Sequence, residues 1–203
     1  MRKMLASLSG LAVVAMALSL AVAADAGKKS GVKPGDTAPS FSLQDQDGKT
    51  VNLSDFKGKI VVLEWFNNDC PFVQRHYKAK TMNEAADKWK DKDVVWLAIN
   101  TTPGKTNESN KQVVQDWSIN HPVLNDSDGT VGKEYGAKST PHMFIIDKDG
   151  KIAYAGGIDN DPDGSKGSAR VNYVDKALDE ITNGKPVSTP ETKQYGCGVH
   201  YGK

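Results

Sequence analysis

The chain has 203 residues, with 26 Lys and Arg against 25 Asp and Glu, and 38% of its residues are hydrophobic. A formal charge of +1 gives no broad attraction for nucleic acid or for an anionic membrane surface, so we expect neither as a partner. The length suits one domain with appended segments.

The N-terminus is predicted to be a targeting segment. Two basic residues precede an apolar run at residues 11–22, and small-residue cleavage sites end at Ala23 and Ala26. These are the three parts of a secretory signal peptide. We therefore expect residues 1–23 to be a signal peptide and the mature protein to be periplasmic or secreted. The run is shorter than the roughly 20 residues that span a bilayer, so no stable membrane anchor is expected after cleavage.

The next segments lead into a predicted sheet. Residues 24–35 are small and basic and contain Gly, which is typical of a flexible lead-in. Apolar residues alternate on both sides of the Asp47-Gly48 turn signal, which predicts a β-hairpin over residues 41–53. The apolar run 59–66 is nearly continuous and indicates a central strand that is buried on both faces.

Helices and strands alternate along the rest of the chain. A long helix is predicted over residues 71–90, because Pro71 suits a first turn and the stretch holds no Gly and no further Pro. We further expect a strand at 94–99, a helix at 107–120 that Pro122 stops, paired strands at 143–146 and 152–155, a Gly-rich stretch at 156–170, a helix at 171–182 and a tail at 185–203. This order predicts an α/β domain over residues 36–184, in which helices flank a β-sheet.

Cys70 is the first candidate for chemistry. It stands where the predicted central strand ends and the long helix begins. Unpaired first-turn amides and the helix dipole stabilise a thiolate at that position, and the thiolate is the nucleophile in thiol chemistry. The alternative is an inert buried cysteine. Asn67, Asn68 and Asp69 precede it and argue against deep apolar burial.

Glu64 and Pro141 are the next candidates. Glu64 is the only charged residue between Ile60 and Phe66, and burial would raise its pKa so that it serves as general acid or base. Alternatively, Glu64 lies near the strand end and reaches water. Pro141, preceded by Thr140, stands directly before a predicted strand, where a simple strand boundary also explains it.

Cys197 is the second cysteine and lies in the tail between two glycines, which make the backbone locally mobile. One hypothesis is that it resolves an oxidised Cys70 by forming a disulfide with it. The alternatives are a permanent structural disulfide that pins the tail, or an unpaired thiol.

The segments VVLEWFNNDCPF and STPHMFIID, together with the order of elements, resemble the thioredoxin superfamily. They are most similar to its redoxin branch, the alkyl hydroperoxide reductase/thiol-specific antioxidant and peroxiredoxin-like proteins, over residues 32–184. The resemblance implies a thioredoxin-like fold with a central mixed β-sheet, with Cys70 as nucleophile, Glu64 as the buried acid and Pro141 as a cis-proline behind Thr140. The tail segment TKQYGCGVHY is similar to the C-terminal stretch of a peroxiredoxin-like subgroup.

Departures from these patterns limit the activity that the resemblance implies. Val73 stands where a thioredoxin-type Cys-x-x-Cys motif has its second cysteine, and Gln74 where copper chaperones of this fold have theirs. Asn67 and Leu63 replace the hydroxyl residue and the proline of a typical peroxiredoxin site. We expect a thiol oxidoreductase that reduces peroxides through Cys70. Its alternatives are protein thiol–disulfide exchange and a non-catalytic binding module such as a metal carrier.

We expect a peroxide or disulfide substrate, an external thiol reductant and no cofactor. No metal site is predicted either. Asp159, Asp161, Asp163 and Gly164 resemble the start of a calcium loop, but Arg170 stands where such a loop needs Glu. Similar Asp-x-Asp-Gly turns recur along the chain, so turn formation explains the pattern.

Overall fold

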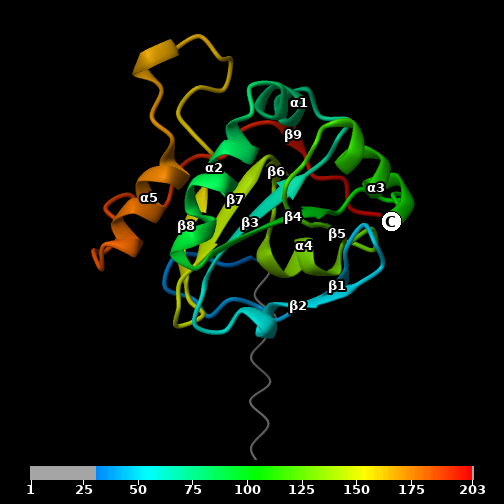
Figure 1. Ribbon diagram of the computed structural model, residues 1–203, viewed down its shortest axis with the longest axis horizontal. Coiled ribbons are helices and arrows are strands. Elements are labelled where there is room, and N and C mark those ends of the chain that lie inside the picture. Colours follow the sequence, from blue (N-terminus) through cyan, green and yellow to red (C-terminus); the bar gives the residue numbers. More distant parts are fainter. Residues whose placement is uncertain (1–30, 203) are drawn as a thin grey trace, which may run out of the picture.

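The computed structural model describes residues 31–202, so the predicted signal peptide and residues 24–30 of the lead-in lie outside the described residues. In this part of the chain no helix is long and apolar enough to cross a membrane. A seven-stranded sheet occupies the centre (Figure 1). Its strands, from edge to edge, are β2 (Thr50–Asn52), β1 (Ser42–Gln44), β5 (Val123–Asn125), β4 (Val94–Asn100), β3 (Ile60–Phe66), β7 (His142–Ile146) and β8 (Ile152–Gly156).

Strand β3 is buried along its whole length, as its apolar sequence predicts. It pairs parallel with β4 and antiparallel with β7, which makes the sheet mixed. Ile60 and Val62 belong to one hydrophobic cluster, which also holds residues of α1 (Pro71–Lys78), α2 (Thr81–Trp89) and α5 (Tyr173–Thr182). Val61 and Leu63 belong to the cluster on the opposite face, which includes α4 (Thr130–Tyr135). Helices therefore cover both faces of the sheet, as predicted.

The single long helix predicted over residues 71–90 is wrong, because the chain forms α1 and α2 with a break at Lys80. Lys80 adopts a left-handed backbone (φ 56°), and its N–H donates to the Tyr77 carbonyl. In an uninterrupted helix Met82 would lie on the opposite face from Val73, given 3.6 residues per turn. Both side chains are fully buried, so the break turns α2 until its apolar face meets the core.

The predicted helix at 107–120 is shorter than expected. Helix α3 (Asn107–Asp116) ends well before Pro122, because Ser118 adopts φ 51° and the Ile119 N–H closes back on the Val114 carbonyl. This is a Schellman closure without its usual glycine. No sequence pattern predicted the short elements β5 and α4, or the two-stranded sheet of β6 (Ser139–Thr140) and β9 (Cys197–Gly198).

The tail is docked on the domain, so the prediction of a locally mobile segment around Cys197 is wrong. Strand β9 pairs antiparallel with β6, and the tail, red in Figure 1, runs behind α1 to reach it. Before β9, the Thr192 N–H donates to the Ala155 carbonyl, and after it the Tyr201 hydroxyl donates to the Ala137 carbonyl at 2.6 Å. Backbone pairing therefore removes the freedom that the flanking glycines would otherwise give.

The described part of the predicted lead-in, residues 31–35, is also bound to the domain. The Val32 N–H donates to the Tyr135 carbonyl, and the Gly35 N–H donates to the Ile152 carbonyl. A Cβ on Gly136 would lie 2.5 Å from the Cα of Gly31, so the two glycines allow the backbones to approach. Ordered structure accordingly begins before residue 36.

The break at Lys80 predicts the effect of a glycine there. We expect Lys80→Gly to raise the free energy of unfolding by about 1 kcal/mol, because glycine adopts the left-handed region without the Cβ clash. The matched control is Lys176→Gly on the exposed side of α5, where glycine should lower stability by about 1 kcal/mol. Urea unfolding of both variants measures this, and a loss of stability in Lys80→Gly would contradict the account of the break.

Candidate active site

Cys70 occupies the position that the sequence predicts, at the N-cap of α1. Its backbone is extended (φ −83°, ψ 120°), and Pro71 begins the helix. The turn between β3 and α1 is fixed by a hydrogen bond from the Cys70 N–H to the Asn67 carbonyl. The Gln74 N–H donates to the Cys70 carbonyl and starts the helical ladder. The thiol therefore lies at the positively polarised end of α1.

The expectation that Cys70 avoids burial is wrong, since only 1% of the residue is exposed and it joins a core cluster. The polar residues before it do not expose it, because the cover comes from elsewhere in the chain. Tyr195 and Cys197 of the tail pack against the same cluster, and the Tyr195 ring contacts the Phe72 ring with centroids 6.0 Å apart. The docked tail thus shields the thiol from solvent.

Thr140 and Pro141 lie against Cys70. The Thr140-Pro141 peptide bond is cis, and the Cys70 Sγ donates to the Thr140 carbonyl at 3.0 Å. The two residues join β6 to β7, so this backbone turns beside the sulfur. Segments that are 70 residues apart in the sequence meet here.

Cys197 also lies at this junction. It is the register partner of Thr140 in the β6–β9 pair, which brings the tail thiol to Cys70. Both cysteines are free thiols, so the alternative of a structural disulfide does not describe this state. The segment before it is tightly packed, since a Cβ on Gly196 (φ 122°) would lie 2.1 Å from the Thr140 carbonyl oxygen. Only glycine fits at position 196, because any side chain would collide with this oxygen.

The two thiols differ in acidity. Burial opposes ionisation of Cys70, but hydrogen bonds from the Cys197 thiol, from Thr140 and from the Val73 and Cys197 amides outweigh it and lower its pKa. Burial and the neighbouring Cys70 raise the pKa of Cys197 to about 11. Cys70 is therefore the thiol that ionises first, and Cys197 keeps the proton with which it stabilises the Cys70 thiolate.

Glu64 is fully buried on β3, so the alternative in which it reaches water is wrong. Burial raises its pKa to about 7, although the hydrogen bonds from Trp96 and Tyr77 act in the opposite direction. Trp96 Nε1 and the Tyr77 hydroxyl both donate to Oε2, at 3.0 and 3.2 Å, and Oε1 has no hydrogen-bond partner within the described chain. A carboxyl in this state exchanges its proton near neutral pH.

His121 extends this buried network towards the surface. Its Nε2 lies 3.1 Å from the Tyr77 hydroxyl and 3.9 Å from Oε2 of Glu64. Burial lowers the pKa of His121 to about 3, so the imidazole is neutral. Sequence reasoning missed Tyr77, Trp96 and His121, because they come from three separate elements and no spacing links them to Glu64.

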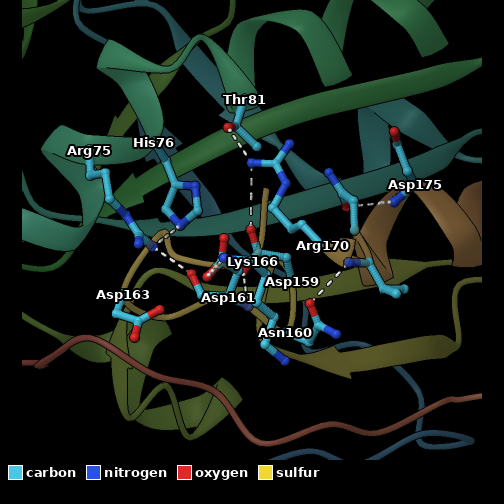
Figure 2. Close-up of polar contacts among 12 residues, drawn as sticks. Arg75, His76, Thr81, Asp159, Asn160, Asp161, Asp163, Lys166, Arg170 and Asp175 are labelled. Carbon is cyan, nitrogen blue, oxygen red and sulfur yellow. Dashed lines mark hydrogen bonds and ion pairs between the residues drawn. The ribbon is translucent and has the colours of Figure 1, made fainter. Parts of the chain in front are cut away.

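The segment of residues 159–164, which resembles the start of a calcium-binding loop, forms turns as predicted. The Asp161 N–H donates to Oδ1 of Asp159, and the Lys166 N–H donates to Oδ1 of Asp161 (Figure 2). Among the described residues no group of three or more His, Cys, Asp or Glu side chains is arranged to hold a metal ion. These carboxylates therefore serve the loop and its neighbours.

A cysteine at a helix N-terminus beside a cis-proline, in a mixed sheet covered by helices, defines a thiol protein of the thioredoxin fold. The model of the AhpC/TSA family matches residues 34–155, and the chain belongs to this family. It is a thiol-based oxidoreductase.

Three relatives illustrate the similarity. A thiol-disulfide oxidoreductase ResA of Bacillus thuringiensis subsp. konkukian is 34% identical over 125 residues, which are 62% of this chain and 70% of the relative. A putative thiol:disulfide interchange protein DsbE of Chlorobium tepidum has a TM-score of 0.55 at 29% identity, over 62% of this chain and 85% of that protein. An uncharacterized conserved protein of Geobacillus kaustophilus has a TM-score of 0.76 at 29% identity, over 83% of this chain and 92% of that protein.

The raised pKa of Glu64 predicts a specific pH dependence of stability. The pKa of Glu64 in the folded protein, about 7, lies above its ordinary value of 4.5. Below pH 4.5 the carboxyl is protonated in both the folded and the unfolded state, so its ionisation does not affect stability. As the pH rises from 4.5 to 7, only the unfolded state loses the proton readily, and the free energy of unfolding falls. The shift corresponds to roughly 3 kcal/mol. Glu64→Gln should remove this dependence, and its stability relative to the wild type should rise by that amount between pH 4.5 and 8.

Urea unfolding across this pH range measures the difference. Glu108→Gln, a carboxamide substitution at an exposed position in the first turn of α3, serves as the matched control. A constant offset between Glu64→Gln and the wild type at every pH would show that Glu64 does not titrate in this window.

Proposed function

We propose that the protein catalyses thiol–disulfide exchange, with Cys70 as the attacking thiol and Cys197 as the second thiol of the couple. The observation that carries the proposal is the junction of Cys70, Thr140 and Cys197, in which the tail brings a protonated thiol to an acidic one. The second cysteine of the missing Cys-x-x-Cys motif is thus replaced by a cysteine of the tail. The names of the relatives that are thiol-disulfide oxidoreductases support the same activity.

The reaction balances as a two-electron exchange. The Cys70 thiolate attacks one sulfur of a substrate disulfide, the S–S bond breaks, and the released substrate thiolate takes a proton. Cys197 then attacks the Cys70 sulfur of the mixed disulfide and releases the second substrate thiol. The substrate is reduced to two thiols while Cys70 and Cys197 become a disulfide, which an external thiol reductant opens again.

Glu64 suits the proton transfers of this cycle. We propose that it exchanges a proton during attack and release, since its pKa of about 7 lets it hold or accept one near neutral pH. Its unpartnered Oε1 is the available site, because Oε2 accepts from Trp96 and Tyr77. Tyr77 belongs to the same hydrophobic cluster as Cys70, so the network lies on the face of the sheet that α1 covers.

The Thr140-Pro141 segment has a proposed role in holding substrate. It sets the Thr140 carbonyl 3.0 Å from the sulfur that a substrate would approach. We expect residues 1–23 to direct the protein across a membrane, where disulfides persist.

Peroxide reduction, the activity first expected from the sequence, fits the site less well. Leu63 and Asn67 replace the proline and the hydroxyl residue of a typical peroxiredoxin site. The Cys197 thiol beside the nucleophile supplies the second thiol with which the protein completes the reduction of a disulfide. The expected partners of the protein are therefore a disulfide substrate and an external thiol reductant.

Substitution of the two cysteines separates their roles. Cys70→Ser should reduce turnover of a model peptide disulfide to background, because it removes the nucleophile. Cys197→Ser should still perform the first attack but accumulate the mixed disulfide, which mass spectrometry detects as a covalent adduct on Cys70. Full turnover in Cys70→Ser would overturn the proposal.

The same assay with hydrogen peroxide tests the substrate class. Stopped-flow oxidation of the reduced wild type should be faster with the peptide disulfide than with peroxide at equal concentration. A faster reaction with peroxide would favour the peroxiredoxin-like function instead.

A further inference from the structure

Tyr195 lies two residues before Cys197 and makes the side-chain contacts that link this part of the tail to the domain. Its hydroxyl lies 2.9 Å from Nε2 of His76 and donates to Oδ1 of Asp159. Its ring lies between two residues of α1, with centroids 6.0 Å from Phe72 and 6.1 Å from His76. Tyr195 therefore connects the tail to the helix that carries Cys70 at its N-terminus.

The two partners of the Tyr195 hydroxyl are themselves buried. His76 is 2% exposed and Asp159 is 1% exposed. Burial lowers the pKa of His76 to about 4, so its ring is neutral. Burial and the bond to Asp159 raise the pKa of Tyr195 and keep its hydroxyl protonated. Since that hydroxyl donates to Asp159, it accepts from His76, which fixes the Nε2–H tautomer of the histidine.

Arginines hold this pair of partners from both sides, as Figure 2 shows. Arg75 Nη2 donates to the Asp161 carbonyl at 2.9 Å. It lies 3.3 Å from Nε2 of His76 but makes no hydrogen bond with it, because in this tautomer both nitrogens are donors. Arg170 Nη1 lies 3.8 Å from Oδ2 of Asp159. The Asp161 N–H fixes the other oxygen of Asp159. The acceptor for the Tyr195 hydroxyl is thus a charged carboxylate in a set orientation, which makes a strong hydrogen bond.

The consequence for Cys197 follows from the short distance along the chain. Only Gly196 separates it from Tyr195, and Gly196 is packed against the Thr140 carbonyl. With the Tyr195 side chain fixed on one side and the β6–β9 pair on the other, Cys197 has little freedom to leave Cys70. A thiol confined in this way acts at a high effective concentration.

The geometry points to Tyr195 as a positioning residue that holds Cys197 at Cys70 through its bonds to His76 and Asp159. This inference rests on the proposed thiol–disulfide exchange and adds a determinant of its equilibrium. The bonds raise the tendency of the two cysteines to form a disulfide, because they restrict the tail in the reduced protein. The loop of residues 159–170 thereby takes part in setting the redox properties of the couple.

The test compares two tail tyrosines. Tyr195→Phe keeps the ring contacts and removes the hydroxyl. Tyr201→Phe removes the hydroxyl of the other tail tyrosine, which donates to the neutral Ala137 carbonyl on the far side of Cys197. Each full-length protein is equilibrated in glutathione buffers of graded ratio, and the fraction with a Cys70–Cys197 disulfide is measured by alkylation and mass spectrometry.

We expect Tyr195→Phe to lower the equilibrium constant for disulfide formation about tenfold, which makes the couple about 30 mV more oxidising. Tyr201→Phe should remain within about twofold of the wild type. A wild-type value in Tyr195→Phe, or an equal shift in both variants, would overturn the inference while leaving the exchange reaction intact. Absence of the disulfide in the wild type at every ratio would overturn the proposed function and this inference together.

A second variant keeps the test valid if Tyr195→Phe does not fold, as judged by circular dichroism. Asp159→Asn retains the tyrosine and the shape of its acceptor but removes the negative charge. It should shift the equilibrium in the same direction, by about threefold, because hydrogen bonds to charged groups are stronger than neutral ones. No shift in this variant would contradict the role of Asp159.

Discussion

The pairing of β6 with β9 is the contact on which the site depends. It brings the register partners Thr140 and Cys197 together, and Thr140 accepts a hydrogen bond from Cys70. One short two-stranded sheet thus joins the helix N-terminus, the cis-proline turn and the tail thiol. Without it, the site would be a single cysteine open to solvent, with no partner thiol.

This pairing also explains how a buried cysteine keeps an acidic thiol. Removal from water raises the pKa of a thiol, and Cys70 is almost completely buried. The same tail that excludes water supplies a thiol and an amide as hydrogen-bond donors, and the first turn of α1 supplies another amide. The tail therefore both covers Cys70 and donates hydrogen bonds to its thiolate. A substrate reaches Cys70 only when the tail moves away.

The sequence predicted those parts of the site that depend on neighbours along the chain. The N-cap position of Cys70 follows from an apolar strand, a polar turn and Pro71, all within a dozen residues. The apolar run around Glu64 suggested burial but left water exposure at the strand end as an alternative. The cover over Cys70 and the network of Tyr77, Trp96 and His121 depend on contacts between distant segments, which no local pattern encodes. The break at Lys80 was missed for a related reason, because packing against the core overrides a stretch with good helix propensity.

The central claim is that Cys197 stabilises the thiolate of Cys70. The most direct measurement is the pKa of Cys70, followed by thiolate absorbance in the wild type and in Cys197→Val, which keeps the tail cover but removes the thiol donor. We expect the pKa of Cys70 to rise in the variant, towards or above its ordinary value. An unchanged or lower pKa would contradict the account.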